Sequence, residues 1–162
     1  MMRVLSIAIL LLVATTLSAQ EKKKIYDPAI DGMQQLDEAV LKAGESGKHV
    51  LVQVGGNWCP WCIRFHDFIG ATHSVDSIIK ADYVFVLLNY SKESKNLKAL
   101  ERLGYPQRFG FPVLVVLDSK GNRLHIQDSG FLEKDKNYSE EKVMTFLKCW
   151  NAKAVDPKTY QE

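Results

Sequence analysis

Residues 55–62 read Gly-Gly-Asn-Trp-Cys-Pro-Trp-Cys and place two cysteines three positions apart. The apolar run His-Val-Leu-Val-Gln-Val at 49–54 precedes this stretch, and apolar residues at helical spacing follow it. This order predicts a strand, a turn and a helix, with Cys59 where the helix begins. Because a helix N-terminus favours negative charge, it favours the thiolate form of cysteine, which is the reactive nucleophile. The stretch therefore predicts thiol chemistry.

The bulk composition predicts one domain with its own core. The chain has 162 residues, of which 46% are hydrophobic, and a formal net charge of +2. So small a charge does not indicate a nucleic-acid surface, and the basic run at 22–24 is expected to be a solvated leader. We expect a monomer with no nucleic-acid partner.

The first nineteen residues differ from the rest of the chain. Arg3 supplies a positive start, residues 4–13 form an apolar block, and small residues follow up to Ala19. This pattern predicts a secretory signal peptide over 1–19 that is cleaved after Ala19, with an uncleaved anchor as the alternative. We therefore expect an exported protein, located in the bacterial periplasm, with no stable membrane association after cleavage.

Export changes how the three cysteines are interpreted. Cys59, Cys62 and Cys149 are too few for a disulfide framework, and one is left over if the close pair bonds to itself. A close pair at a helix start closes too short a loop to stabilise the chain much, so a redox role is favoured over a structural one. Cys149 is expected to be a buried or partly buried small apolar residue of the last helix.

The remaining chain alternates between helical and strand patterns. Ser74 is expected to cap a helix, and residues 24–26 are a candidate edge strand. The pattern predicts helices from Asp31 to Gly44 or Gly47, after the cysteine pair to Gly70, from Ser74, over 94–103 and from Ser139; strands at 50–54, 83–88, 113–117 and 123–128; a turn at 118–122; and a polar loop at 133–138.

This order predicts an α/β fold, with a central mixed sheet of about four strands and helices on both faces. The predicted organisation is a signal peptide over 1–19, a polar N-terminal tail over 20–30, a folded domain over 31–152 and a polar C-terminal tail over 153–162.

Three features of the domain point to a known family. Trp58 stands directly before the Cys-x-x-Cys pair, the pair has a strand-to-helix position, and Phe111-Pro112 opens the third strong strand. In these features the chain resembles the thioredoxin family, and the resemblance covers residues 31–152 as a thioredoxin-like domain. It implies that Pro112 is cis and lies against a redox-active Cys59–Cys62 disulfide.

The resemblance also implies the roles of the site residues. Cys59 would be the exposed attacking thiol, and Cys62, one turn further in, would resolve the mixed disulfide. Pro60 fits the first helical turn because it needs no amide hydrogen there. Trp58 and Trp61 are expected to face the substrate rather than the core.

Two positions depart from the family pattern. The family carries a buried aspartate six positions before the first cysteine, where this chain has Gln53, which cannot titrate. The lysine that partners that aspartate corresponds to Leu87. We therefore expect the proton of the resolving thiol to be transferred through water or another group, with a changed pH profile.

The subclass resembled is that of exported thioredoxin-like proteins and of the C-terminal domain of the bacterial transmembrane thiol-reductant carrier. No large helical insertion separates the cysteine pair from Pro112, which favours a reductase or isomerase over an oxidase. The expected partners are exported proteins with thiols or disulfides and a protein that donates or accepts electrons. No cofactor is expected.

One alternative stays open at this point. The domain could be a non-enzymatic module that binds a partner, or a copper ion through Cys59, Cys62 and His66. His66 follows Cys62 by four residues, so the two side chains could share a helix face. A surface or half-buried helix histidine without a metal is favoured over this site.

Overall fold

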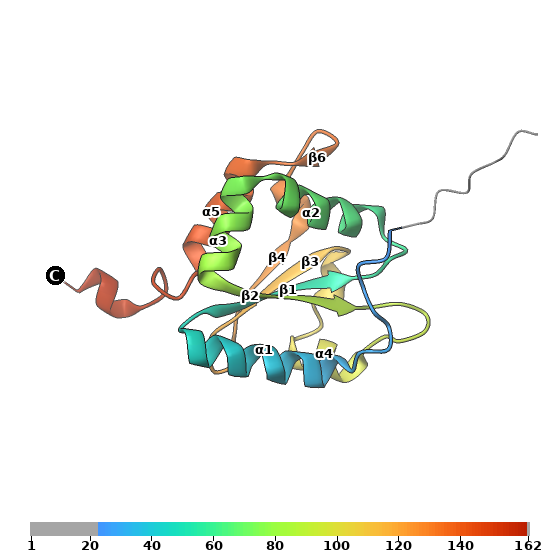
Figure 1. Cartoon of the computed structure of the whole chain (residues 1–162), viewed down its shortest axis with the longest axis horizontal. Helices are drawn as coiled ribbons and strands as arrows, with labels where there is room; N and C mark the ends of the chain where they lie inside the picture. Colours follow the sequence, from blue (N-terminus) through green and yellow to red (C-terminus); the bar gives the residue numbers. More distant parts are fainter. Residues whose placement is uncertain (1–22, 162) are drawn as a thin grey trace, which may run out of the picture.

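The computed structural model describes residues 23–161, which form a four-stranded sheet covered by helices on both faces (Figure 1). The helices and strands are α1 (Gly32–Ser46), β1 (His49–Gly55), α2 (Pro60–Ala71), α3 (His73–Asp82), β2 (Tyr83–Asn89), α4 (Leu97–Arg102), β3 (Val113–Leu117), β4 (Arg123–Asp128), β5 (Glu133–Lys134), β6 (Asn137–Tyr138) and α5 (Glu140–Trp150). Short 3-10 helices lie at Pro106–Phe109, Ser129–Leu132 and Pro157–Tyr160.

The sheet has the strand order β2-β1-β3-β4. Strand β1 is parallel to β2 and antiparallel to β3, and β3 is antiparallel to β4. The predicted α/β fold with a mixed sheet is therefore confirmed. The direction of β3 against β1 does not follow from the alternation of helices and strands, because the connection through α4 could also have returned the chain in parallel.

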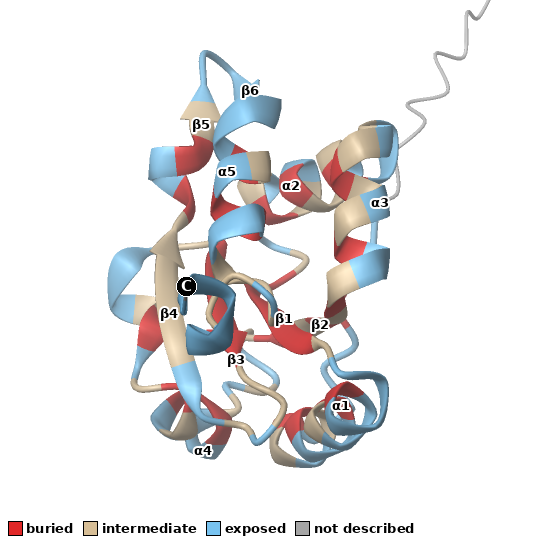
Figure 2. Cartoon of the chain, turned by 90° about the vertical axis from the view of Figure 1, so that its left-hand side faces the viewer, coloured by how far each residue is buried: buried red, intermediate tan, exposed pale blue. Residues whose placement is uncertain are grey.

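The two faces of the sheet bury separate apolar clusters. Along β1, Val50, Val52 and Val54 pack with α1 and α4, while Leu51 packs with α2, α3 and α5. Figure 2 shows the central strands buried. Since side chains alternate along a strand, Gln53 and Gly55 lie on the same face as Leu51, which is the α2 face.

Capping residues set the ends of two helices where the sequence predicts them. The Asp31 side chain accepts hydrogen bonds from the amides of Met33 and Gln34, and Gly47 ends α1 in a left-handed conformation with φ of 66°. The Ser139 side chain accepts from the amide of Lys142 at the start of α5.

Four local predictions were wrong. Ser74 lies inside α3, which begins at His73. Helix α4 begins at Leu97 rather than at 94, because Asn96 takes a left-handed conformation with φ of 48°. Residues 133–138 form the β5–β6 hairpin instead of a loop, and residues 24–26 pair with no strand.

The predicted signal peptide over 1–19 lies outside the described residues. Within 23–161, no helix is both long and apolar enough to span a membrane.

Candidate functional site

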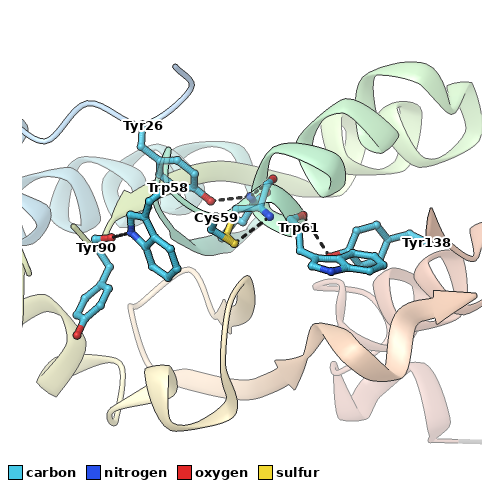
Figure 3. Close-up of a disulfide and its surroundings, with 8 residues drawn as sticks. Tyr26, Trp58, Cys59, Trp61, Tyr90 and Tyr138 are labelled. Carbon is cyan, nitrogen blue, oxygen red and sulfur yellow. Dashed lines mark hydrogen bonds between the residues drawn. A yellow bond between two sulfur atoms is a disulfide. The ribbon is translucent and has the colours of Figure 1, made fainter. Parts of the chain in front are cut away.

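Cys59 and Cys62 form a disulfide at the N-terminus of α2 (Figure 3). Their Cα atoms are 5.2 Å apart. Cys59 is the N-cap residue, and its Sγ accepts a hydrogen bond from the amide of Cys62 at 3.1 Å. Pro60 is the first residue of the helix, as expected. After reduction, a thiolate on Cys59 would meet the free amides of the first helical turn.

Both cysteines are buried, which corrects the expectation that Cys59 is exposed. The residue is only 4% exposed, and Cys62 is fully buried. The cause is the set of side chains that pack against the pair, Ile25, Trp61, Leu87 and Phe111. The expected order is nevertheless kept, because Cys62 is the deeper of the two.

Gly55 and Gly56 bring the backbone close to the pair. A Cβ atom on Gly55 would stand 2.5 Å from Sγ of Cys62. One on Gly56 would stand 2.5 Å from Nε1 of Trp58. Any larger residue would displace these groups, so the double glycine is a steric requirement of the site.

Three aromatic side chains form a wall beside Cys59. Trp58 is 52% exposed, as a substrate-facing residue should be, and its Nε1 donates to the carbonyl of Tyr90 at 2.6 Å. The Phe111 ring lies edge-on to Trp58 at 5.3 Å and stacks on Tyr90 at 4.9 Å. The Phe111–Pro112 peptide bond is cis, as the resemblance implies, and Pro112 is buried.

Trp61 lies on the other side of the pair and is half-buried. Its ring contacts Tyr138 edge-on at 5.5 Å, and the Arg64 guanidinium lies 4.5 Å from its centre. The Tyr138 hydroxyl donates to the Trp61 carbonyl at 3.3 Å. Of the two tryptophans, only Trp58 is thus largely open to solvent.

Gln53 lies directly beneath the disulfide. Its Nε2 donates to the hydroxyl of Tyr26 at 2.6 Å and to the carbonyl of Cys62 at 3.0 Å. Leu87 is its register partner on β2 and packs against the cysteine cluster. An amide and an apolar side chain therefore stand side by side where the family has a charged pair.

Tyr26 and Asn57 are the residues that sequence reasoning missed. The Asn57 Oδ1 accepts from the amides of Ile25 and Tyr26 at 2.8 and 3.0 Å, and its Nδ2 donates to the Tyr26 carbonyl at 2.7 Å. These bonds fasten the chain before α1 to the loop that carries Cys59, and Tyr26 is only 3% exposed. The one available signal was an apolar pair, Ile25-Tyr26, within a polar segment.

A cavity of about 1100 Å³ opens next to the hydrogen bonds between Asn57 and residues 25–26. Tyr26, Asn57 and Trp58 line one side of it, and the loop over 89–95 lines the other. Trp58 and Tyr90 belong both to the lining of this cavity and to the aromatic wall beside Cys59.

The proposed third metal ligand does not join the cysteines. Among residues 23–161, no group of three or more His, Cys, Asp and Glu side chains is arranged to hold a metal ion. Nδ1 of His66 instead lies 3.6 Å from Oδ1 of Asp67. Cys149 is an exposed free cysteine, contrary to expectation, because α5 buries Val143, Phe146 and Leu147 on its other side.

The family described as thioredoxin-like matches residues 31–119, which include the cysteine pair, Gln53 and Pro112. The chain belongs to the thioredoxin-like family.

One known sequence and one solved structure are similar to this chain. The thiol:disulfide interchange protein DsbD of Vibrio cholerae is 30% identical to this thioredoxin-like protein over 99 residues, which are 57% of the chain but only 16% of that protein. A disulphide isomerase from Xylella fastidiosa superposes with a TM-score of 0.68 at 22% identity, over 78% of this chain and 95% of its own. The superposition confirms the fold.

Proposed function

We propose that this thioredoxin-like protein is a thiol–disulfide oxidoreductase that exchanges its Cys59–Cys62 pair with disulfides or thiols of other proteins. The observation that carries the proposal is the disulfide on the first turn of α2, with Sγ of Cys59 at the N-cap. A helix N-terminus stabilises the thiolate that attacks a disulfide, and it needs no cofactor to do so.

The reaction follows from the depth of the two sulfurs. Cys59 is the attacking residue because it retains some exposure, and it forms a mixed disulfide with the substrate. Cys62 then attacks Sγ of Cys59, releases the substrate thiol and restores the intramolecular disulfide. Trp58, Phe111 and Tyr90 form the surface that a substrate chain would contact, and the cavity beside Trp58 gives room for its approach.

We also propose that the protein works after export, in the periplasm, as a reductase or isomerase rather than an oxidase. The pattern over 1–19 supports export. The similarity to a thiol:disulfide interchange protein supports thiol–disulfide exchange, and the lack of a large helical insertion between the cysteine pair and Pro112 supports the direction. Its partners would be exported protein disulfides and a protein that supplies electrons.

A trapping experiment tests the exchange with proteins. In Cys62→Ser, mixed disulfides on Cys59 cannot be resolved, so partner proteins should accumulate as adducts that a reductant releases. Cys59→Ser in the same compartment is the control. Both variants carry Cys149→Ser, because the Cys149 thiol is exposed and would form adducts of its own, and the control should then trap none. The absence of specific adducts at normal expression, or tight copper binding by a dithiol inactive in exchange, would contradict the proposal.

A further inference from the structure

The Tyr26 hydroxyl is buried in the site, and among the described residues its hydrogen has no hydrogen-bond acceptor. The carbonyl oxygen of Cys62 can only accept hydrogen bonds, so the Gln53 atom 3.0 Å from it must be the amide nitrogen. The same nitrogen lies 2.6 Å from the Tyr26 oxygen, which therefore accepts. Within residues 23–161, no nitrogen or oxygen accepts the remaining hydrogen of that hydroxyl.

That hydroxyl shares one buried cluster with Cys62, although it makes no hydrogen bond to the sulfur while the disulfide is formed. The position of a Cβ atom on Gly55 is 2.5 Å from Sγ of Cys62 and 2.7 Å from the Tyr26 hydroxyl oxygen. The sulfur and the oxygen consequently cannot be further apart than the sum of these two distances. Tyr26 also packs with both cysteines in one buried cluster, and Figure 3 shows its ring extending toward the pair.

Few other groups near the pair can titrate. The side chains packed on the cluster, Ile25, Trp61, Leu87 and Phe111, are all uncharged, and Gln53 stays neutral. The titratable group that acts on Tyr26 is Tyr138, whose own hydroxyl is directed to the Trp61 carbonyl. Lys24 and Asp27, which flank Tyr26 in the chain, are exposed.

We infer that Tyr26 is a positioning residue for the resolving step, and that its hydroxyl donates a hydrogen bond to the Cys62 thiolate while Gln53 holds the phenol in place. The inference rests on the proposed function. In this role Tyr26 is a neutral hydrogen-bond donor in place of a buried acid or base. It stabilises the Cys62 thiolate instead of taking the proton from the Cys62 thiol.

The step is balanced without any further reactant. The Cys62 thiol gives its proton to water, and the thiolate attacks Sγ of Cys59. The Cys59–substrate disulfide breaks, the Cys59–Cys62 disulfide forms, and the substrate sulfur leaves with the electron pair and takes up a proton from water. Burial holds the pKa of Tyr26 far above its ordinary range, so the hydroxyl keeps its own proton throughout.

The test separates the two half-reactions with an aromatic disulfide, dithiobis(nitrobenzoate), mixed in excess with the reduced protein. The first equivalent of nitrothiophenolate reports attack by Cys59. The second reports the intramolecular attack by Cys62. All variants carry Cys149→Ser, since that thiol is exposed and would react independently.

Tyr26→Phe should raise the pH midpoint of the second phase by about one unit, the effect of losing one hydrogen bond to a charged group. Because a more basic thiolate is also the better nucleophile, the second phase should be about threefold slower below both midpoints and about threefold faster on the alkaline plateau. The first phase should stay within about twofold of the parent, because the hydroxyl acts on the other sulfur.

Tyr83→Phe is the matched control. It removes another buried hydroxyl, which donates to the Leu147 carbonyl at 2.6 Å. Tyr83 is the first residue of β2, whereas Leu87, which packs on the cysteines, lies near the other end of that strand. This variant should keep the parent midpoint. An unchanged second phase in Tyr26→Phe, or equal changes in both phases, would overturn the role of Tyr26.

The same experiment also tests the proposed function separately from the role of Tyr26. Two released equivalents from the parent, against one from Cys62→Ser, would show that exchange operates whatever the role of Tyr26. A parent that releases only one equivalent would contradict both the resolving role of Cys62 and the role of Tyr26.

Discussion

Gln53 and Leu87 are the residues at which the site departs most from its family. The sequence alone identified both departures, and the register of β1 and β2 confirms that they are neighbours. What the sequence could not provide was the group that contacts Gln53, because Tyr26 lies 27 positions earlier in the chain and approaches through a tertiary contact.

Replacing Gln53 by aspartate should restore a titratable group beneath the disulfide. Burial would disfavour the ionised carboxylate, so its protonation should add an inflection to the pH profile of the resolving step above the ordinary aspartate range. Gln53→Asn, which is shortened equally but cannot titrate, is the control for the lost contact with Tyr26. Stopped-flow thiol exchange between pH 5 and 9 is the measurement, and a Gln53→Asp profile identical to that of the parent would contradict this role.

At the scale of elements, the long periodic segments were predictable and the short ones were not. Helices α1 and α5 have caps and an apolar stripe, β3 is a continuous apolar run, and β1 is a mainly apolar run that Gln53 interrupts, so local patterns suffice. The β5–β6 hairpin has two residues per strand, and the aromatic packing of Tyr138 on Trp61 and Phe65 defines it. No local pattern in the sequence signals such packing.

The segment before α1 is a second case of the same kind. Residues 23–30 were predicted to be part of a polar tail, and most of them are exposed. The hydrogen bonds of Asn57 nevertheless fasten Ile25 and Tyr26 against the active-site loop.

Asn57→Ala should release this segment. Losing its three hydrogen bonds should weaken the attachment of residues 25–26 by about 1.5–4.5 kcal/mol, since each bond contributes about 0.5–1.5 kcal/mol net. Amide hydrogen exchange followed by mass spectrometry should then become faster at residues 25–26 and stay unchanged in β1. Asn57→Asp keeps the acceptor and should show a smaller increase. Equal protection of residues 25–26 in the parent and in Asn57→Ala would show that the hydrogen bonds of Asn57 do not hold this segment in place.

For the whole molecule, three buried tyrosines make the free energy of unfolding depend on pH in the alkaline range. Burial raises the pKa of Tyr26, Tyr83 and Tyr138 well above the ordinary range. Above pH about 10 the unfolded chain loses these protons while the folded protein keeps them. Their stabilising contribution is therefore complete below that pH and is lost as the pH rises further.

The free energy of unfolding should fall above pH about 10, by up to about 1.4 kcal/mol per pH unit for each tyrosine. Denaturant unfolding of the oxidised protein at several pH values between 8 and 11 measures this slope. Tyr83→Phe should make the slope shallower without touching the cysteine site. A slope that is the same in this variant as in the parent would remove Tyr83 from the explanation.

The central claim is that Cys59 attacks disulfides in other proteins, and insulin reduction with dithiothreitol as the electron source tests it most directly. We expect the parent and Cys149→Ser to accelerate the precipitation of insulin chains equally, and Cys59→Ser not to accelerate it at all. Equal acceleration by Cys59→Ser and the parent, or none by the parent, would show that Cys59 does not attack protein disulfides.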